Sequence, residues 1–354
     1  PLHLGCAMWF SMCPLLVTPS RLSSSHTLLQ PSSRHTSKQE SNVAGPAKGK
    51  NLSLVVHGLE NCPIPELGTN DVLLKMHSVR ICDSLMGAWL NVKKPMVLEH
   101  EAAGTVTKVG APVKHLKPGD RVAIEPGIPY LTPLIFCATP LYDGNLCHFY
   151  RHSADFCYKL PDSVTFEEGA LIEPFSVGIY ACCPGSVSLE NKVLVCGAGP
   201  VRIVTLLVAK AMVMVTDLSA SLTKVKEVGV DFTIQVAKET PYNVESLLES
   251  KLKITMECTR AESSIQTGIY THSGGTLGIV GMESEMINLP LVHTAIYYNT
   301  WPRANSMLAS KTLNVKPLVT HMFHLEKTGF LFETAKKRVG LKVMVKCDLS
   351  DQTP

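Results

Sequence analysis

Two kinds of hydrophobic pattern divide the chain into two halves. In the first half, short stretches such as Gly104–Val109 alternate apolar and polar residues, and turns such as Pro118-Gly119-Asp120 separate them. Alternation with a period of two is typical of strands that bury one face. The predicted strands are Asn51–Val56, Val72–Met76, Gly104–Val109 and Arg121–Ile124. We therefore expect a β-rich domain in this half.

After Glu173, continuous apolar runs alternate with helix-like stretches. Val193–Cys196 is apolar throughout, as expected of a strand that is buried on both faces. The other predicted strands are Val213–Thr216, Phe232–Gln235, Ile254–Cys258, Thr276–Val280 and Leu341–Cys347. The predicted helices are Val201–Met212, Ala220–Val228, Val244–Leu252, Glu262–Tyr270 and Leu325–Lys337. This alternation indicates a doubly wound parallel sheet, so the predicted fold class is α/β with a second, β-rich domain.

The net charge of the chain excludes two classes of partner. The sequence has 354 residues, which predicts about two domains, and a formal charge of +3. That excess belongs to residues 1–39, which contain Arg21, Arg34 and Lys38 and no acidic residue. The remainder is neutral, so we expect neither a nucleic-acid partner nor a membrane partner.

Residues 1–50 are predicted to be a disordered leader. Its apolar residues 4–17 are interrupted by Pro14 and follow no basic region, so a secretory signal peptide is not expected. The Ser-rich, acid-free continuation loosely resembles a mitochondrial transit peptide. The 12 cysteines form no C-x-x-C pair, which favours a reducing compartment over a disulfide scaffold. A cytoplasmic location is the main expectation, and a mitochondrial one is the alternative.

A glycine turn between a predicted strand and a predicted helix indicates a dinucleotide site. Gly197 allows the tight turn, and Gly199 lets the backbone approach a pyrophosphate at the helix N-terminus. Asp217 ends the next strand, where a carboxylate accepts hydrogen bonds from ribose hydroxyls and favours NAD over NADP. The third glycine of the usual pattern is replaced by Arg202. The alternative is a doubly wound domain that binds no nucleotide.

A second candidate site lies in the β-rich half. His100 and Glu101 are adjacent and offer a nitrogen and an oxygen ligand, and Cys82 offers a thiolate. Together with a water molecule, these groups would form an open zinc site of the catalytic type. The alternative reading of the His-Glu pair alone is a charged pair on the surface.

These features together resemble the zinc-containing medium-chain alcohol dehydrogenase family, and in particular its polyol-oxidising members. The resemblance covers residues 51–354, and its most specific stretches are Lys114–Pro126, Val164–Val177, Lys192–Pro200 and Met307–His321. It implies a GroES-like catalytic domain and a Rossmann NAD-binding domain. The implied boundaries are 51–175 for the first part of the catalytic domain, 176–296 for the Rossmann domain and 297–354 for the return to the catalytic domain.

The resemblance also implies roles for individual residues. Cys82, His100 and Glu101 match the zinc ligands. Glu173 matches the carboxylate that reaches the zinc water or the substrate, and Ser84 matches the hydroxyl that relays the alcohol proton. The positions that match the NAD site are Gly197, Gly199, Val201, Asp217, Gly281 and Met282. The family reaction passes a hydride from a small polyol to NAD, as in the oxidation of sorbitol to fructose, and the family is homo-oligomeric.

Several positions depart from the family pattern. Glu99 stands where the family has glycine, and Arg202 and Arg260 also stand at glycine positions. Segments are shorter at four places, which are 82–93, 129–136, the residues before 213, and the junction of 296 and 297. The last of these would remove a strand of the subunit interface. Three hypotheses therefore follow: a working polyol dehydrogenase, a non-catalytic relative that retains NAD binding, and a degenerate copy such as a translated pseudogene.

Overall fold

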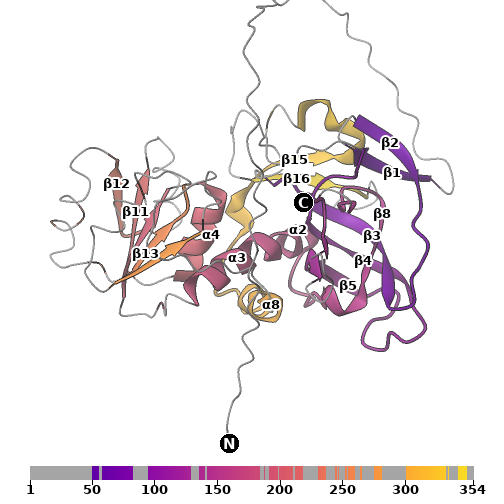
Figure 1. Cartoon of the computed structure of the whole chain (residues 1–354), viewed down its shortest axis with the longest axis horizontal. Coiled ribbons are helices and arrows are strands. Elements are labelled where there is room, and N and C mark those ends of the chain that lie inside the picture. The colour runs from indigo at the N-terminus through magenta and orange to yellow at the C-terminus, as the bar shows by residue number, and fades with distance from the viewer. Residues whose placement is uncertain are drawn as a thin grey trace, which may run out of the picture. The chain divides into compact units, whose positions relative to one another are not determined.

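The fold is described from a computed structural model of the chain (Figure 1). The structure describes residues 50–55, 58–82, 95–128, 135–139, 142–183, 187, 191–197, 199–209, 212–217, 230–236, 244, 246, 252, 254–259, 264, 275–280, 300–331, 334 and 342–348. All of them lie in one compact unit, Ala44–Pro354. The predicted leader, apart from Lys50, lies outside the described residues.

The first sheet is built mainly from the β-rich half. Its strands are β3 (Asp71–Arg80), β4 (Glu101–Val109), β5 (Arg121–Ile124), β8 (Phe149–Ser153), β9 (Cys157–Lys159), β15 (Val319–His324) and β16 (Lys342–Lys346). They follow the order β15-β16-β3-β4-β5-β9, and β8 pairs with β3. Because β16 pairs antiparallel with β3, the chain returns to this sheet near its C-terminal end. The exact domain boundaries stay a prediction.

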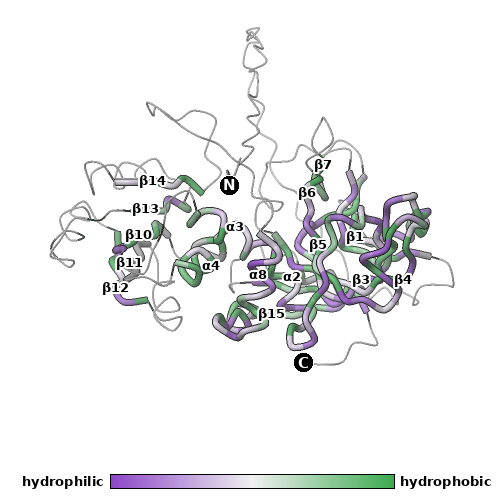
Figure 2. The backbone as a smooth tube through the Cα atoms, turned by 90° about the horizontal axis from the view of Figure 1, so that it is seen from below, coloured by the Kyte–Doolittle hydropathy of each residue, from purple (hydrophilic) through white to green (hydrophobic). Residues whose placement is uncertain are grey.

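Smaller strand pairs complete this half. β1 (Lys50–Val55) pairs antiparallel with β2 (Gly58–Pro63), and β6 (Gly127–Ile128) pairs with β7 (Ile135–Phe136). Figure 2 shows hydrophobic and hydrophilic residues mixed along β3 and β4, in keeping with the alternating pattern that predicted them. A Cβ on Gly104 would lie 2.5 Å from the carbonyl oxygen of Lys75, so glycine is required where these two strands approach each other.

Two helices that the hydrophobic pattern did not predict lie between β9 and β10 in the sequence. They are α2 (Phe166–Ala170) and α3 (Ile172–Cys182). Thr165 and Glu168 form a capping box at the start of α2, because each side chain accepts a hydrogen bond from the other's backbone N–H. Helix α2 packs on β3, β4 and β5. Two further short helices are η1 (Ala154–Phe156) and η2 (Lys316–Leu318).

The second sheet is parallel and has the strand order β12-β11-β10-β13-β14. The strands are β10 (Lys192–Cys196), β11 (Met212–Asp217), β12 (Phe232–Gln235), β13 (Ile254–Glu257) and β14 (Thr276–Ile279). Helix α4 (Pro200–Ala209) follows β10 and is coloured largely hydrophobic in Figure 2. In this order, the first strand β10 lies between the second and the fourth, which is the arrangement of a dinucleotide-binding sheet.

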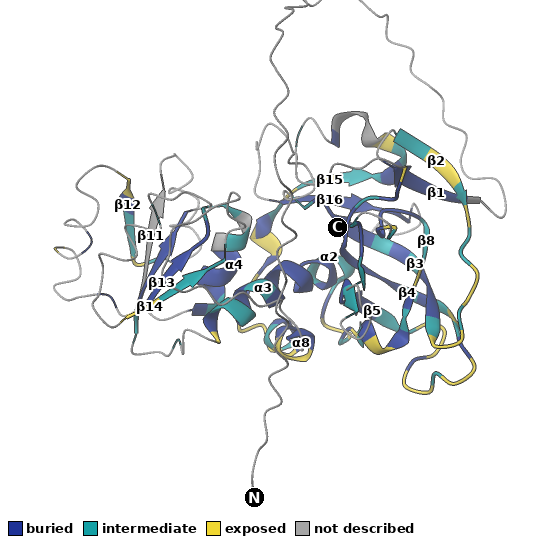
Figure 3. Cartoon of the chain, in the orientation of Figure 1, coloured by how far each residue is buried: buried dark blue, intermediate teal, exposed yellow. Residues whose placement is uncertain are grey.

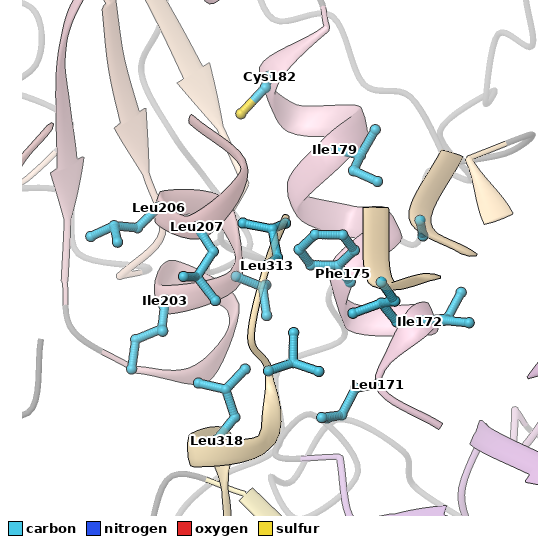
Figure 4. Packing of buried hydrophobic residues seen from close by; sticks show 14 of the residues in the cluster. Leu171, Ile172, Phe175, Ile179, Cys182, Ile203, Leu206, Leu207, Leu313 and Leu318 are labelled. Carbon is cyan, nitrogen blue, oxygen red and sulfur yellow. The ribbon is translucent and has the colours of Figure 1, made fainter. Parts of the chain in front are cut away.

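The main core cluster joins three helices. Phe175 and Ile179 of α3 belong to this cluster together with Ile203 and Leu207 of α4 (Figure 4), and Trp301 lies on α8 (Trp301–Ala309). All five side chains are buried, and Figure 3 shows α3 and β13 as largely buried elements. A second cluster fills the first sheet, around residues such as Val72, Leu74 and Val345.

Two predicted elements require correction. The helix predicted at Val201–Met212 ends at Ala209, and Met212 already begins β11, which pairs with β10 from Met212 to Thr216. Apolar residues continue across that boundary, so the hydrophobic pattern alone does not mark it. The helix predicted at Leu325–Lys337 begins as a 3-10 helix, η3 (Leu325–Phe330). None of the helices that the structure describes has the length and apolar character that crossing a bilayer requires.

Stability is expected to fall in mild acid because of His152. This imidazole is buried and hydrogen-bonds the carbonyl of Glu125 at 2.8 Å, and burial lowers its pKa to about 4. Because the unfolded chain binds this proton near pH 6.5, the contribution is complete above that pH and is lost as the pH falls towards 4. We expect His152 to cost about 2 kcal/mol of unfolding free energy between pH 7 and pH 5.

Urea unfolding of His152→Gln at the two pH values measures this cost. The glutamine amide keeps a donor for the Glu125 carbonyl but does not titrate. The variant should therefore lose less stability than the parent on acidification. His321→Gln, at a more exposed histidine on β15, is the matched control and should behave as the parent does. An equal pH dependence in His152→Gln and the parent would contradict the assignment.

Candidate active site

Cys82 lies two residues after the end of β3. The Ile81 N–H still donates to the carbonyl of Val343 at 3.0 Å, which continues the pairing of β3 with β16. At Cys82 the backbone partner changes, because its N–H donates to the Glu99 Oε2 at 2.9 Å. The backbone of Cys82 is therefore held by Glu99 at the point where the pairing of β3 with β16 ends.

His100 and Glu101 lie at the start of the neighbouring strand. Glu101 is the first residue of β4 and stands directly opposite Arg80 in the β3–β4 register. His100 precedes it and makes an edge-on ring contact with Phe136, with centroids 5.2 Å apart. Both side chains are buried. The pairing of β3 with β4 therefore brings together residues that are 18 positions or more apart in the sequence.

Cys82, His100 and Glu101 form a compact group of potential metal ligands. One ligand atom from each of the three residues lies within 4.8 Å of the other two. The Nδ1 of His100 and the Oε2 of Glu101 are buried and have no hydrogen-bond partner in the part of the chain that the structure describes. Buried polar atoms usually have a partner, so these unsatisfied atoms fit a site that a cation completes.

Arg80 holds the other oxygen of Glu101. Its Nη1 donates to the Glu101 Oε1, and both side chains are almost completely buried. Burial opposes ionisation of Glu101, but the charges of Arg80 and Lys342 outweigh it and lower the pKa of the carboxyl. Glu101 is therefore kept ionised, with one oxygen anchored and the other available as a ligand.

The electrostatics of Cys82 also fit a cation. Burial raises the pKa of its thiol well above the ordinary value, and the charges of Glu101, Glu99 and Glu173 act in the same direction. A divalent cation supplies the positive charge that favours the thiolate form of Cys82 in these surroundings. Glu173 itself is buried in the first turn of α3.

Glu99 occupies an unusual backbone conformation beside this group. Its φ of 68° lies in the left-handed region that favours glycine, yet its side chain is buried. Burial raises the pKa of the Glu99 carboxyl to about 8, although His100 and the amide of Cys82 lower it. A glutamate at the position where the family has glycine therefore places a buried carboxyl group beside the candidate ligands.

The glycine turn lies at the carboxyl end of β10. Gly197 has a φ of 103°, which a residue with a side chain rarely adopts, and Gly199 precedes α4. Val201 lies in the first turn of α4, and Asp217 ends β11, beside β10. The turn thus lies between β10 and β13, where the strand order reverses and where ligands bind in sheets of this kind.

Some predicted residues cannot be compared with the structure. Ser84, Gly281 and Met282 lie outside the described residues, and of Asp217 only the backbone is described. Conversely, the motif analysis did not single out Arg80. The sequence nevertheless contains a signal for Arg80. If the two strands are paired so that Cys82 lies near Glu101, Arg80 lies opposite Glu101. Cys196 and Cys258, which end two of the predicted strands, are buried.

Glu257, which the motif analysis also did not single out, ends β13 opposite Cys196 of β10. Its Oε1 accepts hydrogen bonds from the Thr259 N–H and hydroxyl, each at 2.5 Å, and from the Ser264 hydroxyl at 2.7 Å. These bonds hold Thr259 and Ser264 to the end of β13. The acid followed by hydroxyl residues at 259 and 264 is the sequence signal for this network.

Comparison with known proteins identifies the family. Residues 68–162 match the family described as alcohol dehydrogenase GroES-like domain. The sorbitol dehydrogenase of Mus musculus is 70% identical over 357 residues, which covers 88% of this chain and 100% of the relative. The chain belongs to the sorbitol dehydrogenases. These lie within the medium-chain family of zinc-binding, NAD(P)-dependent alcohol dehydrogenases.

Solved structures agree on the fold. An oxidoreductase of unknown specificity from Escherichia coli is 29% identical, with a TM-score of 0.77 and coverage of 84% of this chain and 99% of that one. A zinc-binding dehydrogenase from Sinorhizobium meliloti bound to NADP is 18% identical, with a TM-score of 0.76 and coverage of 85% and 100%. The predicted fold class, a GroES-like domain with a Rossmann domain, is confirmed.

Length distinguishes this chain from its sorbitol dehydrogenase relatives. The 357 residues of the mouse protein are matched by 88% of this chain, which is about 312 residues, so about 45 are missing from the shared region. This agrees with the shorter segments that the family pattern indicates. The comparisons nevertheless give no support to the interpretation as an inactive relative.

Proposed function

We propose that this protein is a zinc- and NAD-dependent polyol dehydrogenase that oxidises sorbitol-like polyols to ketoses, such as sorbitol to fructose. The observation that supports this most directly is the group of Cys82, His100 and Glu101, whose ligand atoms lie within 4.8 Å of one another. Thiolate, imidazole and carboxylate are the donors that zinc uses, and three protein ligands leave one position open for chemistry. The high identity to sorbitol dehydrogenases supports the substrate class.

In the proposed site, Cys82, His100 and Glu101 hold the zinc ion. When bound, zinc supplies a Lewis acid that polarises the substrate hydroxyl and lowers its pKa. Arg80 keeps Glu101 ionised and correctly oriented, as the partner of a metal ligand commonly does. Arg80, His100 and Glu101 are buried, which favours the exclusion of water from the proposed site and strengthens the electrostatic interactions there.

Two further residues handle the proton of the substrate. Ser84 is proposed to accept the alcohol proton and pass it towards solvent. Glu173 is proposed to hydrogen-bond the substrate or the water that precedes it. The buried position of Glu173 in the first turn of α3 supports its assignment to a site from which water is excluded.

The cofactor is proposed to bind at the turn after β10. Gly197 and Gly199 give the pyrophosphate access to the N-terminus of α4, where N–H groups and the helix dipole favour an anion. Val201 lies in the same first turn. Gly281 and Met282 are proposed to border the nicotinamide. The ribose hydroxyls would hydrogen-bond Asp217 at the end of β11.

Asp217 is expected to set the preference for NAD. Replacing it with serine removes the negative charge that repels a 2′-phosphate and one acceptor for the ribose hydroxyls. We expect Asp217→Ser to raise the dissociation constant for NAD about tenfold. The difference in binding affinity between NAD and NADP should become smaller. Titration of both cofactors by NADH or NADPH fluorescence measures the effect. Unchanged affinity for both cofactors would exclude this role.

The proposed function is tested on the purified full chain. Metal analysis should find about one zinc per chain, and NADH should form when sorbitol and NAD are added. Removal of zinc by a chelator should abolish NADH formation, and added zinc should restore it. A chain without bound zinc and without turnover would overturn the proposal.

Two finer properties follow from the family. A cytoplasmic location suits an enzyme of small uncharged substrates and the reduced cysteines that the structure describes. A homo-oligomer is proposed from the family. The shortening near residues 296 and 297 affects the segment that the family uses at the subunit interface, so size-exclusion chromatography with light scattering is the appropriate measurement.

A further inference from the structure

We propose that Glu99 is a positioning residue of the metal centre, which holds the ligand Cys82 in place through its backbone N–H. The inference rests on the proposed function, because it assigns a partner to one of the proposed zinc ligands. It begins from the hydrogen bond between the Cys82 N–H and the Glu99 Oε2 at 2.9 Å. That side chain replaces the strand pairing that ends at Ile81.

The conformation of Glu99 requires support from its neighbours. A φ of 68° is unfavourable for a residue with a Cβ, and such conformations persist only where the surroundings enforce them. Residues 144–146 provide this support. Their N–H groups donate to the carbonyls of residues 97–99 in three bonds, Gly144 to Val97 at 2.8 Å, Asn145 to Glu99 at 2.8 Å and Leu146 to Leu98 at 3.0 Å.

Gly144 makes this support possible. A Cβ at that position would lie 2.2 Å from the carbonyl oxygen of Glu99 and 2.3 Å from that of Leu98. The two backbones therefore pack in direct contact, and residue 99 keeps its left-handed conformation. That conformation directs the carboxylate towards Cys82 rather than towards solvent. Strained conformations of this kind are concentrated at functional sites.

The second oxygen of Glu99 supports a role beyond packing. Its Oε1 is buried and has no hydrogen-bond partner among the described residues. A buried carboxyl group with an unsatisfied oxygen is costly, so a purely structural role would favour glycine or an apolar residue at this position. Instead, the residue combines a strained backbone with a buried polar side chain that contacts a proposed ligand.

Glu99 and Arg80 thus act on different ligands. Arg80 anchors the side chain of Glu101, whereas Glu99 anchors the main chain of Cys82. Partners of metal ligands typically change metal affinity by about 10- to 100-fold when they are replaced. We therefore expect the loss of Glu99 to be seen in metal binding before it is seen in folding.

Two variants separate positioning from simple packing. Glu99→Gln retains an acceptor for the Cys82 N–H, whereas Glu99→Gly removes the acceptor and also relieves the backbone. Zinc affinity is measured by competition with a chromogenic chelator. Cobalt substitution adds a spectroscopic signature, because the thiolate-to-cobalt charge-transfer band reports whether Cys82 is bound. The melting temperature of the metal-free chain is recorded for each variant.

The parent chain is measured first, since a parent that binds neither metal overturns the proposed function and this inference with it. With metal binding in the parent, we expect about tenfold weaker zinc binding in Glu99→Gly. We also expect a weaker charge-transfer band in that variant and a melting temperature at or above that of the parent. Glu99→Gln should stay within about threefold of the parent affinity. Parent-like binding in Glu99→Gly, or an equal loss in both variants, would overturn the positioning role alone.

Discussion

Replacing His100 with alanine is expected to abolish metal binding and, with it, dehydrogenase activity. His100 provides the only nitrogen donor in the candidate group, and its removal leaves Cys82 and Glu101. Catalytic zinc sites use three protein ligands, so two residues should not retain the ion against dialysis. Since even partners of ligands change affinity by about 10- to 100-fold, the loss of a ligand should exceed about 100-fold.

Metal content after dialysis and chelator competition measure this loss. Circular dichroism checks that the His100→Ala chain is folded, because the buried imidazole also packs against Phe136. His321→Ala is the matched control, since this histidine hydrogen-bonds only the neighbouring Thr320 among the described residues and lies far from residue 100 in the sequence. His100→Ala that retains nearly one zinc per chain would show that the metal centre lies elsewhere.

Much of the fold was predictable because strand periodicity is a local signal. The predicted strands Arg121–Ile124 and Phe232–Gln235 agree with β5 and β12 at both ends. The helices α2 and α3 were not predicted, because Pro174 and a nearly continuous apolar stretch hide their periodicity. The capping pair Thr165 and Glu168 was the available signal for α2.

The candidate site was predictable as a set of residue types but not as an arrangement. The ligand types at Cys82, His100 and Glu101 follow from zinc chemistry, whereas their proximity depends on the β3–β4 register. The conformation of Glu99 was less accessible still. It depends on Gly144 and its neighbours, which are 45 positions away in the sequence, so no local pattern reveals it. Long-range packing therefore determines the parts of the site that the sequence alone does not.

Arg80 is expected to produce the largest loss of stability among the charged residues described here. Arg80→Met leaves Glu101 buried and ionised without its hydrogen-bond partner. Removing one member of a buried ion pair typically costs about 3–5 kcal/mol. Lys342 also lowers the pKa of the Glu101 carboxyl and compensates part of this charge, so we expect a loss near the lower end of that range. Urea unfolding of the metal-free chain measures it.

Arg151→Met is the matched control for Arg80→Met. Arg151 pairs with Asp71 at 3.4 Å, but its side chain is 49% exposed, so its loss should cost less than about 1 kcal/mol. The double variant Arg80→Met/Glu101→Gln should recover most of the loss, because the unpaired charge is then absent. Equal losses in Arg80→Met and Arg151→Met would contradict the buried charge as the cause.

Zinc provides the final test of how the ion pair and the metal centre are connected. Arg80 is proposed to orient Glu101 for the cation, so the destabilisation by Arg80→Met should be at least as large in saturating zinc as in its absence. The parent gains stability from zinc according to its affinity, and a variant that loses only orientation gains less. A larger gain in Arg80→Met than in the parent would show that Arg80 competes with the cation for Glu101. An equal or smaller gain would show that Arg80 mainly orients the ligand, as proposed here.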